Sequence, residues 1–190
     1  MRKKKMGRLQ MTLAVVCICF FIGIITGAVS ERGLSTEQAT KLSTYWGICG
    51  NENTDFSRLF IKHGKYIIAM WLSGFVLPGS IIILIIIFTT GIFYGFSAAF
   101  AAQSKGITYV LTNIFPQNAL LIPLYIFTAV WTIMYVLKKY SNNGPKSRIR
   151  QERRKTLTEH TVILGVCLLC NSAVCIVEIC IERFLTNFLN

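Results

Sequence analysis

The chain has 190 residues, 53% of them hydrophobic, and a mean hydropathy of +0.54. This composition is too apolar for a water-soluble domain of this length and indicates a membrane protein. The formal net charge of +12 does not indicate nucleic-acid binding, because 13 of the 20 basic residues lie in two clusters beside apolar segments, residues 2–8 and 138–155. Such clusters are typical of the cytoplasmic flanks of membrane spans, and no recognisable fold would present them to a groove of DNA or RNA.

The first apolar segment, residues 11–30, follows the first basic cluster and is long enough to span a bilayer. It superficially resembles a signal peptide, but AVS at residues 28–30 is only a weak cleavage site. We therefore favour an uncleaved signal anchor with a cytoplasmic N-terminus. The loop that follows, residues 31–58, carries four acidic and three basic side chains, a near-neutral balance that fits the outside.

Residues 66–104 form an uncharged run that is too long for one span and long enough for two. A turn is predicted at LPGS, residues 77–80, where Pro78 removes a backbone donor and Gly79 permits conformations closed to other residues. The turn divides the run into predicted spans at residues 59–77 and 80–103.

The span at residues 59–77 is long enough only if three polar side chains near its start sit at the outer interface, with the lysines snorkelling. These are Lys62, His63 and Lys65.

Two further spans are predicted at residues 119–137 and 161–181, on either side of a basic loop at residues 138–158. Because the N-terminus and this loop are both predicted to be cytoplasmic, an even number of spans must separate them. The prediction is an all-α, polytopic membrane helical bundle, a single domain over residues 1–190. It has about five transmembrane helices and an external C-terminus.

The stretch NIFPQNALLIP, residues 113–123, interrupts the apolar pattern at the outer mouth of the third and fourth predicted spans. Pro116 suits the start of a helix, because its missing N–H would be unpaired there anyway. Gln117 and Asn118 can cap neighbouring backbone groups, and Pro123 is expected to bend the first turns.

Two pairs of glycines lie four residues apart, Gly23 with Gly27 and Gly91 with Gly95. Small residues at this spacing let membrane helices approach closely. They predict a packing face, inside the fold or with a partner. The alternative is that glycine is simply common in membrane helices.

Glu178 lies about 10 Å from the middle of the last predicted span, towards the outer surface. A carboxylate there would be costly if it faced lipid, so it is expected to face protein or water, or to be protonated. A functional role and simple interfacial anchoring are both open.

Signatures of catalysis are hard to find in the sequence. His63 and His160 fall on opposite sides of the membrane in the five-span arrangement, and neither HExxH nor GxSxG occurs. We expect no enzyme activity, no cofactor and no metal site. Cys49 has no evident partner, and the other cysteines are expected to pack inside apolar segments; they are Cys17, Cys19, Cys167, Cys170, Cys175 and Cys180.

Three motifs resemble one family. They are HGKYIIAMW at residues 63–71, GSIIILIIIFTTGIFYGF at 79–96 and above all FPQNALLIP at 115–123. From His63 to Met134 the chain resembles stage II sporulation protein M, a polytopic membrane protein of endospore-forming bacteria. Glu178 and the Gly23–Gly27 pair also fit the pattern of this family.

The resemblance implies a non-catalytic role in engulfment of the forespore, in the mother-cell membrane at the sporulation septum. It implies a membrane anchor and scaffold for two peptidoglycan-degrading partners, sporulation proteins D and P. Tethering would bring these partners together at a high effective concentration.

The alternative from another class is a small transporter or channel component that acts as an oligomer. It is motivated by Lys105, Glu178 and the proline-broken element at residues 115–123, since broken helices at membrane depth line cavities or bind solutes. An intramembrane hydrolase is the least favoured hypothesis. The basic loop is explained equally by attraction to anionic membrane lipid and by its role as a topology signal.

Overall fold

The computed structural model describes residues 2–45, 55–76, 78–111, 115–140 and 146–189. These residues form seven helices and no strand. In chain order the helices are α1 (Arg2–Arg32), α2 (Thr36–Tyr45), α3 (Phe56–Ser73), α4 (Gly79–Lys105), α5 (Ile107–Tyr109), α6 (Phe115–Tyr140) and α7 (Lys146–Leu189).

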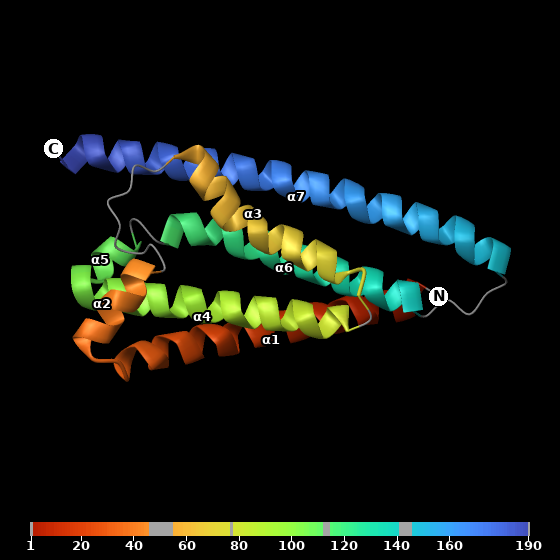
Figure 1. Ribbon diagram of the computed structural model, residues 1–190, viewed down its shortest axis with the longest axis horizontal. Helices are drawn as coiled ribbons and strands as arrows, with labels where there is room; N and C mark the ends of the chain where they lie inside the picture. Colours follow the sequence, from red (N-terminus) through yellow and green to blue (C-terminus); the bar gives the residue numbers. More distant parts are fainter. Residues whose placement is uncertain (1, 46–54, 77, 112–114, 141–145, 190) are drawn as a thin grey trace.

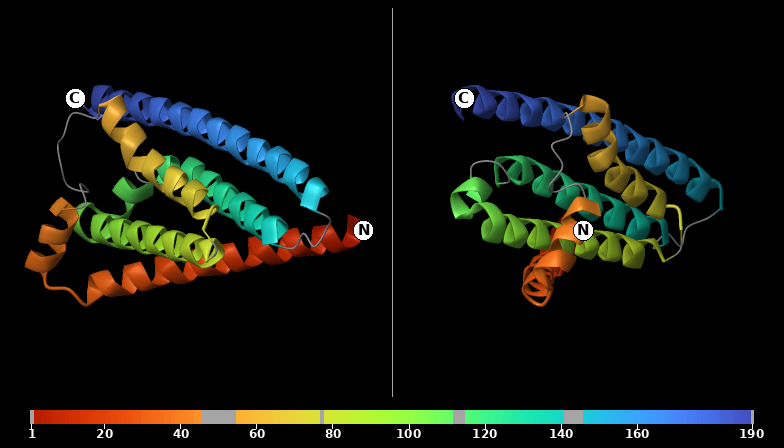
Figure 2. Two further views of the ribbon diagram at one scale, coloured as in Figure 1. Left: turned by 45° about the vertical axis from the view of Figure 1, so that its right-hand side comes forward. Right: turned by 60° about the vertical axis from the view of Figure 1, so that its left-hand side comes forward.

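Five of these helices run along the bundle in alternating directions, as Figure 1 shows. They are α1, α3, α4, α6 and α7. The start of α1, the turn from α3 to α4, the end of α6 and the start of α7 lie together at what we call the N-terminal end. The end of α7 lies at the other end with α2 and α5, which we call the C-terminal end, and the turned views of Figure 2 show the same arrangement.

Four of the helices are long and apolar enough to cross a membrane: Gly7–Arg32, Gly79–Ser104, Asn118–Lys139 and Arg154–Ile181. The predicted spans at residues 11–30, 80–103, 119–137 and 161–181 lie within them. The protein is therefore an all-α, multi-pass membrane protein.

The predicted span at residues 59–77 corresponds to α3, which is not among these four. It begins earlier and ends earlier than predicted, at Phe56 and Ser73. Three basic side chains in its first ten residues, Arg58, Lys62 and Lys65, are exposed and keep the helix from being uniformly apolar.

The turn between α3 and α4 overlaps the predicted one at Pro78 but begins earlier, since α3 ends at Ser73 and α4 already begins at Gly79. The N–H of Gly74 bonds to the carbonyl of Trp71 at 3.1 Å, and the carbonyl of Pro78 accepts the N–H of Ile81 at 2.9 Å. Leu77 is outside the described residues. Gly79 does not adopt a conformation closed to other residues, so the predicted reason for this glycine is wrong. Among the described residues only Gly106, with a φ of 87°, has a positive φ. A Cβ on Gly79 would instead overlap the carbonyl oxygen of Ser73, so the turn needs glycine for close approach.

Both predicted loops are shorter than expected. The segment at residues 31–58 contains the end of α1, all of α2 and the start of α3. The segment at 138–158 is largely helical, since α6 continues to Tyr140 and α7 begins at Lys146. Lys, Arg, Gln and Glu are good helix formers, so a basic segment outside the membrane does not have to break a helix. At 44 residues, α7 is about 66 Å long, roughly twice the hydrocarbon thickness of a bilayer.

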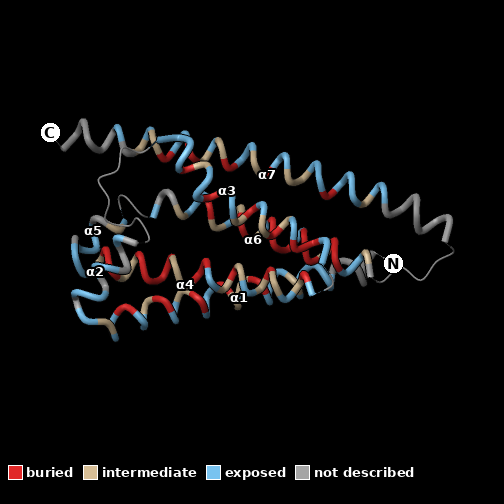
Figure 3. Tube along the Cα trace, viewed as in Figure 1, coloured by how far each residue is buried: buried red, intermediate tan, exposed pale blue. Residues whose placement is uncertain are grey.

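The core lies between α4 and α6. Each of the helices α1, α3 and α7 packs one side against it. Figure 3 shows buried positions along the facing sides of these helices and mostly exposed positions on the outer sides of α1 and α7. The most buried core side chains include Ile67, Ile83, Ile87, Leu121 and Tyr125. Large apolar side chains on the outer sides, such as Phe21 and Leu169, are exposed as expected for groups that face lipid.

Candidate functional site

The first candidate site is the contact between α1 and α4, where two glycines face each other. A Cβ on Gly23 would lie 2.5 Å from the carbonyl oxygen of Phe88 and 3.1 Å from the Cα of Gly91. A Cβ on Gly91 would lie 2.5 Å from the carbonyl oxygen of Phe20. The two backbones are therefore in direct contact, and no larger residue fits at either position without moving a helix.

The second glycine of each pair repeats this arrangement one turn further on. A Cβ on Gly27 would overlap the carbonyl of Ile92, and a Cβ on Gly95 would overlap the carbonyl of Ile24. The structure thus brings all four predicted glycines together at one helix crossing within the chain. Backbone contact of this kind increases the number of close atom pairs, which is what holds membrane helices together.

The second candidate site is a set of polar side chains buried at the interface of α3, α6 and α7. Glu178 faces protein, 7% exposed, and its Oε2 lies 3.4 Å from Nε2 of His63, which is also 7% exposed. This distance is longer than that of a charge-assisted hydrogen bond, about 2.7–2.9 Å. Among the described residues neither of these two atoms has a hydrogen-bond partner.

The other ring nitrogen of His63, Nδ1, lies next to Tyr125 of α6. The hydroxyl of Tyr125 lies 3.4 Å from Nδ1 of His63 and donates to the carbonyl oxygen of His63 at 3.3 Å. A hydroxyl has one proton and two lone pairs. The tautomer of the imidazole decides whether this hydroxyl accepts a proton from Nδ1 of His63 or donates to it.

Tyr94 of α4 extends this set, since its hydroxyl interacts with that of Tyr125. Tyr66 of α3 packs edge-on against Tyr125, with ring centroids 6.1 Å apart. We call Glu178, His63, Tyr125 and Tyr94 the polar chain. It connects α7, α3, α6 and α4 in that order, across the bundle.

Asn171 provides a further polar contact between α3 and α7. Its side chain is fully buried, and Nδ2 donates to the carbonyl oxygen of Phe60 at 3.4 Å. A Cβ on Gly64 would lie 3.6 Å from the same Nδ2, an ordinary van der Waals contact. The Oδ1 atom of Asn171 has no partner among the described residues.

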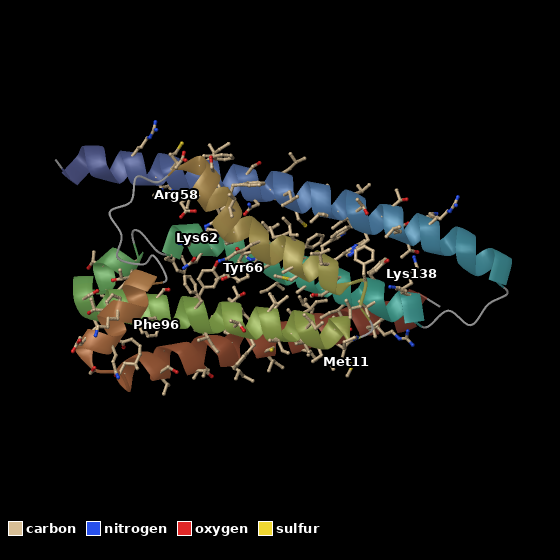
Figure 4. The ribbon with its side chains drawn as sticks, in the orientation of Figure 1. Met11, Arg58, Lys62, Tyr66, Phe96 and Lys138 are labelled. Atoms are coloured by element: carbon tan, nitrogen blue, oxygen red, sulfur yellow. The ribbon has the colours of Figure 1, made fainter. Side chains whose placement is uncertain are left out.

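The sequence places His63 with Lys62 and Lys65 at the outer interface, and this prediction is wrong for His63, which faces inward. The two lysines are exposed, whereas His63 points into the bundle. The signal was helical spacing: Leu59, His63, Ile67 and Met70 repeat at intervals of four, four and three and are all buried. Figure 4 shows Arg58 and Lys62 towards the C-terminal end of the bundle and Lys138 at the N-terminal end.

His160 lies in a separate cluster near the N-terminal end. Its ring stacks on Tyr135 at a centroid distance of 4.1 Å and on Trp71 at 5.8 Å, and the residue is 2% exposed. Its Nε2 lies 3.4 Å from the carbonyl oxygen of Trp71. A Cβ on Gly74 would come within 2.9 Å of the same nitrogen, so this glycine makes room for the imidazole. The two histidines therefore contact opposite parts of α3 and do not share a site.

The segment that contains FPQNALLIP forms the start of α6, with Pro116 in its first turn and Pro123 inside the helix. Asn118 is half-buried and Pro123 is exposed. The side chains of Pro116 and Gln117 are outside the described residues, as are residues 112–114.

The described residues contain no group of three or more His, Cys, Asp or Glu side chains that could hold a metal ion. The six cysteines in this part of the chain are free: Cys17, Cys19, Cys167, Cys170, Cys175 and Cys180. Cys49 lies outside the described residues.

Comparison with models of known protein families shows which family the chain belongs to. The model of the family described as "Stage II sporulation protein M" matches residues 16–187, nearly the whole sequence. The chain belongs to this family. The matched range of the sporulation protein M family includes both candidate sites and the FPQNALLIP segment. No match to a curated protein or to a solved structure was found.

The glycine crossing leads to a prediction about stability. In Gly95→Ala the added methyl group overlaps the carbonyl of Ile24, so α1 and α4 must separate, at an expected cost of about 1–3 kcal/mol. Gly165→Ala is the matched control, because a Cβ there meets nothing within 4 Å and alanine favours the helix. Equilibrium unfolding of the purified protein by SDS in mixed micelles measures both changes. Equal stability of the two variants would contradict the importance of the crossing.

The His160 cluster leads to a second prediction. His160→Ala removes the ring between Trp71 and Tyr135, and the loss of two ring contacts is expected to cost about 1–3 kcal/mol. Thr161→Ala on the same turn is the control, because Thr161 is exposed and its hydroxyl bonds only within its own helix, to the carbonyl of Leu157 at 3.1 Å. The same unfolding assay compares them, and a cost for His160→Ala no greater than that for Thr161→Ala would refute the prediction.

Proposed function

We propose that this protein is a non-catalytic membrane anchor and scaffold that recruits and couples peptidoglycan-degrading partners at the septum during endospore engulfment. The observation that carries the proposal is membership of the sporulation protein M family, which implies a role in sporulation. The partners are sporulation proteins D and P, and the site of action is the mother-cell membrane at the septum, as the family resemblance implies.

The contacts between the helices support a scaffold role. The glycine crossing fixes α1 against α4, and the polar chain ties α4 to the remaining long helices. The elements at the C-terminal end, including α2, which packs on α4, are therefore held in place. A partner that docks there is kept close to a second one, which raises their effective concentration. We place this docking surface at α2 and the start of α6, with Gln117 and Asn118.

The orientation in the membrane follows from the distribution of charge. Arg8, Lys138, Arg154 and Lys155 lie on segments at the N-terminal end of the bundle, which we assign to the cytoplasm under the positive-inside rule. With this assignment α3 makes the fifth crossing. It contacts α4, α6 and α7, so one side of this helix is covered by protein, while its basic side chains are exposed. The C-terminus then lies outside.

Labelling of single cysteines tests the fifth crossing. In a variant with all seven native cysteines replaced by alanine, Ser35→Cys should react with a membrane-impermeant maleimide on intact cells. Arg154→Cys should react only after permeabilisation, and both positions are exposed in the structure. If α3 does not cross, residues 35 and 154 lie on the same side, so labelling of both in intact cells would contradict the arrangement.

The buried carboxyl group of Glu178 supports a second candidate, a small transporter or channel component that acts as an oligomer. Ionisable residues buried in membrane helices often mark ion or proton pathways. The polar chain, however, runs across the bundle. A pathway for ions or solutes must run along the bundle, from one end to the other. We therefore rank this candidate second.

Co-purification distinguishes the two candidates. From sporulating cells, the gently solubilised wild-type protein should recover both hydrolases. The Gln117→Ala, Asn118→Ala double variant should insert normally but recover them about tenfold less. The control is Thr158→Ala with Glu159→Ala, two exposed residues near the opposite end, which should leave recovery unchanged. Absence of hydrolases from the wild-type complex, together with solute conductance by liposomes that contain this protein alone, would overturn the scaffold proposal.

A further inference from the structure

α3 carries a charged side chain in the middle of an otherwise apolar exposed surface. Its exposed residues Ile61, Lys65, Ile68 and Leu72 follow one another at intervals of four, three and four, and so lie on one side of the helix. We call these four residues the lysine face. In Figure 1 α3 lies in front of α6, and its other sides contact α4, α6 and α7. The lysine face is therefore the side of α3 that the described helices of this chain leave uncovered.

Contacts with two neighbouring helices show that Lys65 lies near the middle of the spans. A Cβ on the preceding residue, Gly64, would lie 4.0 Å from Cδ2 of Leu168, which is at the centre of the apolar stretch of α7. The ring of the following residue, Tyr66, packs on that of Tyr125 at a centroid distance of 6.1 Å. Tyr125 is about 5 Å from the centre of the apolar stretch of α6. Both neighbours thus place Lys65 close to mid-height.

In the arrangement in which α3 crosses the membrane, the ammonium group of Lys65 does not reach the lipid headgroups. Half of the hydrocarbon core is about 15 Å thick, whereas an extended lysine side chain is only about 6 Å long. Lys62 lies about one turn nearer to the outside and can extend towards the surface. Lys65 has no such route, and charged side chains inside the membrane almost always pair with another group, because an uncompensated charge among lipid tails is costly.

The described part of the chain offers Lys65 no carboxylate. Its Nζ lies 5.0 Å from the centroid of the Tyr66 ring, and this ring carries no net charge. None of the ion pairs between described residues includes Lys65. Its positive charge is therefore not neutralised within the fold.

A second copy of this chain does not supply the missing charge either. Residues 56–151, which include α3, α4 and α6, contain no Asp or Glu. On α7, Glu159 lies nine residues before Leu168, about 14 Å along the helix, and pairs with Lys138 at 3.8 Å. Glu178 lies ten residues after Leu168 and is buried against His63. Neither carboxyl group is at the height of Lys65.

We propose that the lysine face of α3 is a docking surface for a transmembrane helix of another protein, and that this helix carries an Asp or Glu side chain at mid-membrane height. The carboxylate pairs with Lys65, so the contact buries no net charge. Ile61, Ile68 and Leu72 pack against apolar side chains of the same helix, at the four- and three-residue intervals by which one helix packs along another. A helix without a carboxylate leaves the lysine unpaired, so the ion pair also selects the partner.

This surface is separate from the one proposed at α2 and the start of α6, which lies at the C-terminal end of the bundle. The inference rests on the proposed crossing of α3. Labelling of residues 35 and 154 tests that crossing independently, so failure of the crossing and failure of the docking surface give different results.

A pair of synthetic membrane peptides tests the docking surface. Each is a leucine–alanine helix of about 24 residues with a single Glu or a single Gln at its centre and an acceptor dye at one end. The full-length protein without native cysteines carries a donor dye at Ser35→Cys, in phosphatidylcholine vesicles. Energy transfer should show that the Glu peptide binds at least about tenfold more tightly than the Gln peptide. Equal binding, with residues 35 and 154 labelled on opposite sides of the membrane, would overturn the docking surface and leave the crossing intact.

Two substitutions of Lys65 assign the preference to this side chain. Lys65→Met should abolish the preference for the Glu peptide. Lys155→Met is the matched control, because Lys155 is an exposed lysine at the N-terminal end of the bundle, and it should bind like the wild type. If Lys65→Met does not fold, Lys65→Glu keeps the test decisive, since it should prefer a peptide with a central Lys over the Glu peptide. A preference for the Glu peptide that survives either change at residue 65 would refute the proposal.

Anionic lipid is the competing partner for Lys65, and vesicles that contain about 30% phosphatidylglycerol distinguish it. Lipid phosphates stay near the membrane surface, so the preference for the Glu peptide should persist in these vesicles. Loss of the preference there would assign Lys65 to lipid phosphate and overturn the proposal.

Discussion

Helices in a bilayer gain little free energy from burying apolar surface against one another, because lipid tails are equally apolar. The bundle must therefore be held by close backbone approach and by polar contacts. Both devices are present and are used in different places. Four glycines bring the backbones of α1 and α4 into direct contact, while the polar chain joins α4, α6, α3 and α7.

The polar contacts explain the position of α3. Its basic residues keep it out of the four helices that are long and apolar enough to cross a membrane, yet it lies against α4, α6 and α7. Two histidines hold it at different points: His63 through Glu178 and Tyr125, and His160 through the rings of Trp71 and Tyr135. The basic residues that make α3 hard to recognise as a span are exposed, whereas His63, on the buried side of the helix, attaches it to its neighbours.

Periodicity and charge located most of the helices because the bilayer imposes their length and apolar character. They failed at the ends, since basic residues beyond the membrane continue the helix, as in α7 from Lys146 onwards. Glycine spacing singled out Gly23, Gly27, Gly91 and Gly95 but did not say which helices meet there. Glu178 was recognisable as a costly group, whereas its partner was not, because the pair is separated by more than a hundred residues in the chain.

The sequence by itself determined the class of the protein, its four long apolar helices and its family, since hydropathy, basic flanks and the FPQNALLIP motif are local properties of the chain. Only the tertiary structure decided that the glycine pairs face each other, that Gly79 is required for close approach, and that His63 faces Glu178. These features depend on which side of each helix meets which neighbour. Helix packing decides this through side chains far apart in sequence, and a span of apolar residues looks the same whichever way it is turned.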